Sequence, residues 1–469
     1  MTPGSTEHPL RVAVIGAGPA GFYVAEHLLR RTDLTIDVDL FDRLPTPYGL
    51  VRAGVAPDHQ KIKAVTATFD KIAAHPRFRF YGGVELGKHI DVADLRTHYH
   101  QVVYTTGAQT DRRMDIPGED LPGSHPATEF VAWYNGHPDY RDYQFDLSQE
   151  RVAVVGVGNV AVDVARILCR TPEELARTDI AEHALEALRH SRVREVYLLG
   201  RRGAAQAAFT NPEIKELGEM EGADVVVRPE EVELDPLSRA ALEQSGDRVG
   251  AKKVEILQSY ARRAATGKPR RLTVRFLVSP TALLDNGGGG VGAIRLVRNR
   301  LVTSATGAIQ AQATGQHEEL AAGLVFRSVG YRGVPLPGVP FDDKWGVVLN
   351  EKGRVLDPET KHPLPGEYTA GWIKRGPSGV VGTNKPDAAE TVTAMLEDAA
   401  AGHAPVPPEH DPAALDRLVR QRQPHVVGWS EWLRLNELEV ARGRAHGRPR
   451  EKFTRVDEML EALGNRPRG

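Results

Sequence analysis

The feature that most constrains this 469-residue chain is a glycine-rich turn that lies between an apolar run and an amphipathic helix and occurs twice. The first copy is RVAVIGAGPAGFYVAEHLLRR, and the second is RVAVVGVGNVAVDVARILCR. In each copy a β-branched run predicts a strand and the residues after the turn predict a helix. The strand-like segment TIDVDLFDR follows the first copy and VREVYLLGRR the second. The sequence therefore predicts an α/β protein with two Rossmann-like nucleotide-binding domains, each built on a βαβ unit.

The first turn, Gly16-Ala17-Gly18-Pro19-Ala20-Gly21, has the G-x-G-x-x-G spacing of a dinucleotide site. Its first glycine permits a tight turn, its second lets the backbone approach a pyrophosphate, and its third lets helix and strand pack closely. Asp42 ends the next strand, about 20 residues on, where an acid binds ribose hydroxyls. We therefore expect a dinucleotide without a 2′-phosphate at this turn.

The second turn, Gly156-Val157-Gly158-Asn159-Val160-Ala161, has alanine as the accepted variant of the last glycine. The strand that would present an acid ends instead at Arg201 and Arg202. Paired guanidinium groups bind a 2′-phosphate through charge-assisted hydrogen bonds, so this turn is predicted to prefer NADPH over NADH. The alternative is that both arginines form a solvated strand end.

Together the two turns indicate a resident FAD and an exchangeable NADPH, because a flavin accepts a hydride and releases single electrons. The residues of the turns do not identify the electron acceptor. The alternatives are an NADPH-dependent flavin diaphorase, a subunit of a larger reductase complex and a non-enzymatic dinucleotide sensor.

The single cysteine, Cys169, excludes several classes of protein. It cannot close an internal disulfide, form a Cys-X-X-Cys centre or supply an iron–sulfur cluster. A secreted disulfide scaffold and a flavoenzyme of the thioredoxin reductase kind are therefore excluded, and so is a glutamate synthase small subunit with its cysteine-rich segment. Cys169 lies on the apolar face of the second predicted helix, which indicates a buried structural thiol. No metal site is predicted.

Hydropathy and charge limit the cellular location and the binding partners that the sequence allows. There is no apolar run of about 18 residues, which argues against a membrane span. The apolar start of the first turn resembles a signal peptide, but its spaced glycines and Glu26 argue against one. The formal net charge of −2 gives no overall attraction to nucleic acid. We expect a cytoplasmic protein.

Several long blocks carry a resemblance to a known family. They are LPTPYGLVRAGVAPDHQKIK, GNVAVDVARIL, LGRRGAAQAAFT, RSVGYRGVPLPGVPFD and GWIKRGPSGVVGTNKPDAAETV. The chain resembles the adrenodoxin reductase family of ferredoxin–NADP⁺ reductases, and the tail HGRPREKF is similar to bacterial members. The resemblance implies a glutathione/adrenodoxin reductase-like fold and an FAD-dependent oxidoreductase. Such an enzyme moves electrons between NADPH, which gives a hydride to flavin N5, and a one-electron iron–sulfur ferredoxin.

The resemblance also implies how the domains are arranged. We expect an FAD domain made of residues 1–106 and 331–469, with an NADPH domain of residues 107–330 inserted between its segments. The glycine-rich stretch Asn286–Gly292 is expected to be a hairpin connection within a meander of strands, and the residues beyond Gly402 a charged helical tail.

The cofactor residues follow from the same resemblance. It implies that Gly16, Ala20, Asp42, Leu50 and Val84 bind FAD together with Trp372, Gly379, Val380 and Val381. It implies that Arg112, Val157, Gly158, Asn159, Val160, Arg201, Arg202 and Glu213 bind NADPH, with Gly379 under the nicotinamide. Gly18 and Gly21 belong to the FAD turn. Val157, Asp42 and Gln60 depart from the commoner family residues, and none of these departures threatens the assignment.

His59 and Glu216 are the candidates for catalytic proton handling, because the family places their equivalents beside the nicotinamide and the flavin. A histidine with a pKa near neutrality suits proton transfer. The alternative is that His59 only orients its loop and Glu216 is an exposed helix residue.

A ferredoxin partner is acidic, so a basic docking surface is expected. Residues 251–276 hold eight basic side chains and one acid, and we predict that part of this run, with Arg262 and Arg263 as candidates, faces the ferredoxin. The alternative is a solvated face. Nucleic-acid binding is less favoured, because the run has few interleaved aromatic residues.

Overall fold

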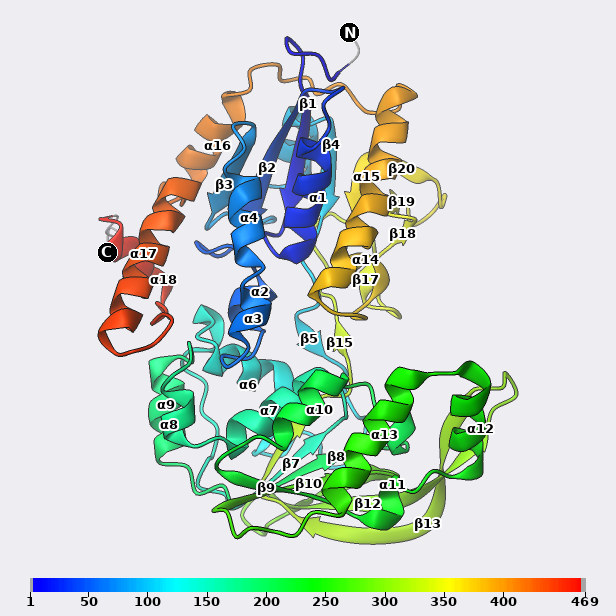
Figure 1. Cartoon of the computed structure of the whole chain (residues 1–469). Coiled ribbons are helices and arrows are strands. Elements are labelled where there is room, and N and C mark those ends of the chain that lie inside the picture. Colours follow the sequence, from blue (N-terminus) through cyan, green and yellow to red (C-terminus); the bar gives the residue numbers. More distant parts are fainter. Residues whose placement is uncertain (1–2, 465–469) are drawn as a thin grey trace. The chain divides into compact units, whose positions relative to one another are not determined.

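The computed structural model describes residues 3–464, which fold into two compact α/β units (Figure 1). Unit 1 contains the residues up to Val55, His59–Thr110 and the residues from Tyr331 onward. Unit 2 contains Ala56–Asp58 and Asp111–Gly330. Apart from Ala56–Asp58, the chain passes from unit 1 to unit 2 between Thr110 and Asp111. It returns to unit 1 between Gly330 and Tyr331.

Unit 1 is built on a seven-stranded sheet with the order β18-β19-β20-β4-β1-β2-β3. The five strands from β20 to β3 are parallel, and β19 and β18 extend the β20 edge with antiparallel pairing. The strands are β1 (Leu10–Ile15), β2 (Ile36–Asp42), β3 (Phe78–Gly82), β4 (Gln101–Tyr104), β18 (Asn350–Glu351), β19 (Arg354–Leu356) and β20 (Pro363–Thr369).

Both faces of this sheet are covered. Successive side chains of a strand point to opposite faces, so alternate residues of β1 pack against different helices. In β1, Val12 and Val14 belong to a core cluster that includes α1 (Pro19–Leu29), α4 (Thr66–Ala73) and α15 (Asn384–Ala400). Ala13 and Ile15 belong to a second cluster that includes α5 (Val92–His98) and α16 (Ala414–Arg422). Figure 1 shows α1, α4 and α15 side by side on one face. The uninterrupted apolar run of β1 thus follows from burial on both sides.

Shorter helices complete unit 1, and helices also form beyond Gly402. The helices beyond Gly402 are α16, α17 and α18. Unit 1 also contains α2 (Leu50–Ala53), α3 (Gln60–Lys63), α14 (Trp372–Arg375), α17 (Trp429–Ala445), α18 (Val456–Ala462) and the hairpin of β16 (Phe341–Asp342) with β17 (Val347–Val348).

Unit 2 is built on a six-stranded, fully parallel sheet with the order β6-β14-β7-β8-β10-β9. Its strands are β6 (Ser124–Pro126), β7 (Arg151–Val155), β8 (Glu195–Leu199), β9 (Ala223–Val227), β10 (Arg270–Arg275) and β14 (Leu324–Arg327).

Different layers cover the two faces of this sheet. The largest core cluster packs helices on one face: α6 (Ala127–Tyr134), α7 (Asn159–Cys169), α9 (Glu182–Arg189), α10 (Asn211–Leu217) and α13 (Arg248–Ala261). A separate three-stranded antiparallel sheet of β11 (Val278–Asp285), β12 (Val291–Thr303) and β13 (Ile309–Ala321) packs on the other face. The residues between β11 and β12 are the predicted hairpin connection, so the expected meander is confirmed.

The lone cysteine is buried, and the described helices are not suited to cross a membrane. Cys169 is fully buried, and burial raises the pKa of its thiol to about 12, so the prediction of a structural thiol is confirmed. Between residues 3 and 464, no helix combines the length and the apolar character needed to cross a membrane.

Candidate dinucleotide-binding sites

The first glycine turn connects β1 to α1, and its three glycines meet three different conditions. Gly16 has a φ of +113°, and a Cβ there would lie 2.8 Å from the Thr105 carbonyl oxygen. A Cβ at Gly21 would lie 2.2 Å from the Gly16 carbonyl oxygen. At Gly18, by contrast, a Cβ would have no neighbour within 4 Å. Gly16 and Gly21 are therefore required by the chain itself, while the space beside Gly18 is open.

That open space lies at the N-terminus of α1, where backbone N–H groups without an intrahelical partner favour an anion. Gly18 is the N-cap residue of the helix and Pro19 its first residue. A pyrophosphate can therefore approach the backbone at Gly18, which is the role expected of the second glycine.

Asp42 joins the glycine turn to the end of β2. Its Oδ2 accepts a hydrogen bond from the Ala17 amide at 2.8 Å, and its Oδ1 accepts one from the Leu44 amide at 2.9 Å. Burial raises the pKa of this carboxyl group, and the two backbone bonds act against the rise. Since each carboxylate oxygen can accept a second hydrogen bond, Asp42 can brace the turn and still bind a ribose hydroxyl.

A second turn, at Tyr48 and Gly49, lies directly against the first. Tyr48 has a φ of +83°, unusual for a bulky residue, and its amide donates to the Ala17 carbonyl at 2.7 Å. A Cβ at Gly49 would lie 3.0 Å from the Cα of Gly18. Strained backbone of this kind persists only where surrounding contacts hold it. Sequence reasoning missed this turn as a site element, although it lies within the block LPTPYGLVR.

Helix α17, in the C-terminal part of unit 1, supplies such contacts. Trp432 donates through its Nε1 to the Tyr48 hydroxyl at 3.2 Å, and that hydroxyl donates to Asp70. Arg52 forms two hydrogen bonds with Glu439, one of them 2.8 Å long, and the Glu439 side chain is fully buried. The helical tail therefore holds the segment that carries Leu50.

The carboxyl end of β20 completes the site in unit 1. Gly371 has a φ of +81°, and a Cβ there would lie 2.6 Å from the Cβ of Ala20, so the loop after β20 passes the first turn of α1. Trp372 follows, with its Nε1 donating to the Ser378 carbonyl at 3.1 Å and its ring stacked on Tyr331 at a centroid distance of 6.0 Å.

The remaining residues predicted to bind FAD also lie in unit 1. Val84 is buried, and its amide donates to the Asp42 carbonyl at 2.8 Å. Leu50 begins α2 and is 43% exposed, and Val380 is 51% exposed. Val381 opens the short 3₁₀ turn that precedes α15.

Gly379 has a local reason to be glycine. Its φ is +82°, and a Cβ there would lie 2.3 Å from the Thr383 Oγ1. The family resemblance places Gly379 under the nicotinamide, but the backbone conformation by itself already requires glycine at this position.

The arrangement in unit 1 therefore follows the general rule for open parallel sheets. The ends of β1, β2, β4 and β20 bring the glycine turn, Asp42, Thr105 and Gly371 to one edge, and ligands bind at that carboxyl edge.

The second glycine turn repeats this geometry in unit 2. Gly156 has a φ of +131°, and a Cβ there would lie 2.2 Å from the Ser328 carbonyl oxygen. A Cβ at Gly158 would have no neighbour within 4 Å, and Ala161 is fully buried. As at Gly18, the second glycine of the motif is the one with open space beside it.

The loop after β8 encloses this turn. The Val157 carbonyl accepts hydrogen bonds from the amides of Ala208 at 2.9 Å and Phe209 at 3.0 Å. The Asn159 Oδ1 accepts one from the Thr210 amide at 2.8 Å. The side chain of Asn159 is therefore used to hold the loop.

Arg201 and Arg202 leave the end of β8 beside this turn, since a Cβ at Gly200 would lie 2.9 Å from a Val157 methyl group. Arg201 is exposed and Arg202 half-buried. Within residues 3–464, neither guanidinium group has an ion pair or a side-chain hydrogen bond. Partial burial and the neighbouring Arg201 lower the pKa of Arg202. Two adjacent positive charges without a carboxylate are suited to an anion with more than one negative charge.

Arg112 and Glu213 occupy different surroundings. Arg112 is exposed, and its amide donates to the Gly330 carbonyl at 2.9 Å. Glu213 is buried and pairs with Arg166 at 3.2 Å. Arg166 is fully buried and also binds Asp58 at 2.7 Å and Asp163 at 2.8 Å. Sequence reasoning missed this ion-pair cluster, although Asp163 and Arg166 stand one helical turn apart in a recognised block.

The two candidates for proton handling belong to different units. His59 is a buried residue of unit 1 that precedes α3. Glu216 is a half-buried residue of α10 in unit 2, with its carboxylate 4.0 Å from Arg166.

The basic run 251–276 is divided between the surface and the interior of unit 2. Lys253 and Arg275 are buried, with Lys253 bonded to the Ala207 carbonyl and Arg275 to Glu231. The side chains of Lys268 and Arg270 donate to backbone carbonyls, and Lys252 and Arg271 pair with acids. Arg262 and Arg263 are exposed at the C-terminal end of α13, where Arg263 lies over the Tyr260 ring. The run is therefore not one continuous patch.

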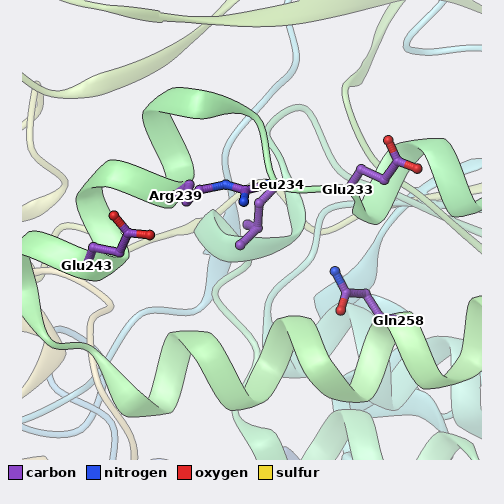
Figure 2. A pocket seen from close by; sticks show the side chains of 5 residues that line it. All are labelled: Glu233, Leu234, Arg239, Glu243 and Gln258. Carbon is purple, nitrogen blue, oxygen red and sulfur yellow. The ribbon is translucent and has the colours of Figure 1, made fainter.

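A hollow of about 480 Å³ also lies in unit 2, next to α11 (Pro229–Val232) and between α12 (Pro236–Ser245) and α13. Figure 2 shows its lining side chains, Glu233, Leu234, Arg239, Glu243 and Gln258. None of them is a predicted site residue, and we assign the hollow no role.

Comparisons with known proteins decide the family. The model of the pyridine nucleotide-disulphide oxidoreductase family matches residues 10–231. A probable ferredoxin/ferredoxin–NADP reductase of Mycobacterium tuberculosis is 47% identical over 98% of this chain and 76% of its own length. The chain belongs to the ferredoxin–NADP⁺ reductase family. The human mitochondrial NADPH:adrenodoxin oxidoreductase is 42% identical, over 97% of this chain and 92% of its own length.

The fold agrees with this family assignment. The structure of M. tuberculosis FprA in complex with NADPH superimposes with a TM-score of 0.91 at 44% identity, covering 97% of this chain and all of the other. The resemblance to adrenodoxin reductase-type ferredoxin–NADP⁺ reductases, the two Rossmann-like domains and the enzyme class of flavoprotein oxidoreductase are therefore confirmed.

Proposed function

We propose that the protein is an FAD-dependent ferredoxin–NADP⁺ reductase that moves electrons between NADPH and a one-electron iron–sulfur ferredoxin. The observation that carries the proposal is the contrast between the two glycine turns. An acid, Asp42, closes the first, while two arginines without carboxylate partners stand beside the second. Relatives that are 42–47% identical are named for this activity.

FAD binds in unit 1 in this proposal. Its pyrophosphate lies at Gly16, Gly18 and Gly21, its ribose at Asp42, and the adenosine half along Ala20, Leu50 and Val84. Its ring system lies along Trp372 and Gly379–Val381. The open position at Gly18 and the carboxyl edge formed by β1, β2, β4 and β20 support this placement.

NADPH binds in unit 2. The residues that hold it are Val157, Gly158, Asn159 and Val160 at the pyrophosphate and Arg201 and Arg202 at the 2′-phosphate. Arg112 and Glu213 are added to this set on the family resemblance alone. The domains of the proposal are residues 1–106 with 331–469 for FAD, and 107–330 for NADPH.

When bound, FAD would accept a hydride from NADPH and give up electrons singly, which joins a two-electron donor to a one-electron partner. The protein's own residues position the two nucleotides, and His59 and Glu216 are assigned to proton handling. The cluster around Arg166 fixes Glu213 in α10, one helical turn before Glu216.

The proposed partner is an acidic ferredoxin in the cytoplasm, docked on Arg262 and Arg263. In the part of the chain that the structure describes, these are the two arginines of the basic run that are exposed and have no ion pair with an acid. Since charges at the rim of an interface mainly affect encounter rates, reversing both to Glu should raise the KM for ferredoxin and weaken its salt dependence. An unchanged KM at low salt would refute docking at this pair. Lys252→Glu, a charge reversal on the same helix at a paired residue, is the control.

The activity itself is tested by cytochrome c reduction under NADPH with and without added ferredoxin. The proposal expects rapid reduction only when ferredoxin is present. Equal reduction without any iron–sulfur protein would instead identify a diaphorase.

A further inference from the structure

The backbone that carries Arg201 and Arg202 is held by the three-stranded sheet of unit 2. The Gly200 carbonyl accepts a hydrogen bond from the Val278 amide at 3.1 Å, and the Arg202 carbonyl accepts one from the Leu277 amide at 3.1 Å. Both donors lie at the junction of β10 and β11. The carbonyl between them, that of Arg201, receives its hydrogen bond from a side chain on β12.

That side chain is Asn299. Its Nδ2 donates to the Arg201 carbonyl at 2.8 Å and to the Ser279 Oγ at 2.8 Å, so both of its amide hydrogens are used. Asn299 is only 8% exposed, and its backbone amide donates to the Leu277 carbonyl at 2.7 Å.

The strand geometry aims this side chain. The pairing of β12 with β13 is irregular between Val297 and Asn299, and such irregularities re-aim side chains. Leu277, which Asn299 holds through its backbone, has a φ of +57°. A non-glycine residue in this region persists where its surroundings fix it. Asn299 therefore connects the strained junction at Leu277 to the segment of Arg201 and Arg202 through hydrogen bonds.

We propose that Asn299 is a positioning residue for recognition of the NADPH 2′-phosphate, acting through the backbone of Arg201; this rests on the proposed binding of NADPH to unit 2. Asn299 bonds to the backbone of Arg201 and leaves the guanidinium group available. Two adjacent guanidinium groups repel each other, so a mobile segment would let them separate before the phosphate arrives. A fixed backbone reduces the ordering cost of binding.

The packing of the antiparallel sheet on the Rossmann core brings Asn299 to this loop. Val278 and Leu296 bury apolar surface against Val155 and Leu199, which brings β12 beside the end of β8. The sheet thus supplies a fixed hydrogen-bond donor to the loop that distinguishes the two nicotinamide cofactors.

The test compares two ligands that differ only in the 2′-phosphate, 2′-phospho-ADP-ribose and ADP-ribose, titrated calorimetrically into the FAD-loaded enzyme. The variant Asn299→Leu keeps the shape and removes the donor. It should bind 2′-phospho-ADP-ribose about tenfold more weakly, the equivalent of about 1.4 kcal/mol. ADP-ribose binding should change less than about twofold, because its contacts are to the glycine turn.

Ser279→Ala is the matched control, because it removes the other acceptor of Asn299 and leaves the bond to Arg201. It should bind both ligands as the wild type does. Asn299→Asp is a second variant of the same shape that cannot donate when ionised, and it should lose the same selectivity. Flavin absorbance and thermal unfolding establish that each variant is folded.

Three results would overturn the proposal: unchanged selectivity in both Asn299 variants, equal weakening of both ligands, or the same loss of selectivity in Ser279→Ala. Failure of the proposed function is seen separately. In that case the wild-type enzyme itself would bind the two ligands equally, before any variant is compared.

Discussion

Gly18 and Gly158 allow the two cofactor sites to be disabled one at a time. Each is the N-cap of a helix, with φ of −84° and −98°, which alanine also adopts. Apart from its own residue and the two chain neighbours, a methyl carbon at either position would have no atom of residues 3–464 within 4 Å. Replacing either glycine with alanine should therefore cost the fold no more than about 1 kcal/mol, the scale of an N-cap change.

In the proposed sites, the same methyl group would project into the space of the pyrophosphate. Displacing one charge-assisted hydrogen bond costs about 1.5–3 kcal/mol, which corresponds to a loss of affinity of roughly 10- to 150-fold. Gly18→Ala should therefore be purified with little FAD and yet be folded. Gly158→Ala should retain its FAD but need much more NADPH for anaerobic bleaching of the flavin.

The assays are the ratio of flavin to protein absorbance and an NADPH titration of flavin bleaching. Gly16→Ala is the contrasting variant, because it combines a positive φ with a clash against the Thr105 carbonyl, so it should destabilise the fold itself. The reasoning is refuted if Gly18→Ala retains full FAD, or if Gly158→Ala loses FAD rather than NADPH affinity.

The remaining predictions concern the buried charged and titratable groups. Glu439→Ala should lower the free energy of unfolding of unit 1 by about 3–5 kcal/mol in urea, because it removes the fully buried carboxylate that pairs with Arg52 and Arg450. The exposed Glu437→Ala should change it by less than about 0.5 kcal/mol, and equal effects would contradict the account. Cys169, with a thiol pKa of about 12, should not react with a thiol reagent at pH 8 in the folded protein. Rapid modification would contradict the burial of Cys169. The flavin of the Cys169→Ala variant should be reduced as in the wild type. Burial raises the pKa of Asp111 from 3.8 to about 6, so the folded state binds the proton more tightly and stability should fall as pH rises from about 4 to about 6. Asp111→Asn should flatten that part of the stability profile measured by thermal unfolding, and an unchanged slope would show that another group is responsible.

The parts of the fold that are local in sequence were predictable. Strand, turn and helix follow one another within 20 residues in both glycine motifs, and Gly16, Gly21, Gly156 and Ala161 meet the steric conditions that the spacing implies. The hairpin after Asp285 and the buried Cys169 were likewise predicted from composition and periodicity.

The contacts that join distant segments were not predictable. Glu439 lies 387 residues from Arg52, and no pattern in either segment indicates that they meet. The exposure of the basic run 251–276 was not predictable from its number of charges. Alternation along a strand and around a helix buries some of these charges and exposes others. Lys253 and Arg275 are buried for this reason, whereas Arg262 remains at the surface.

The measurement that tests the central claim most directly is anaerobic reduction of the bound flavin by NADPH and by NADH, in the wild type and in the Arg201→Ala/Arg202→Ala double variant. Loss of two charge-assisted contacts at about 1.5–3 kcal/mol each predicts a fall of at least about 100-fold in the preference for NADPH. The account predicts that the wild type strongly prefers NADPH and that the double variant uses both nucleotides nearly equally. A wild-type enzyme that is reduced as readily by NADH, or a double variant that keeps the preference, would contradict it.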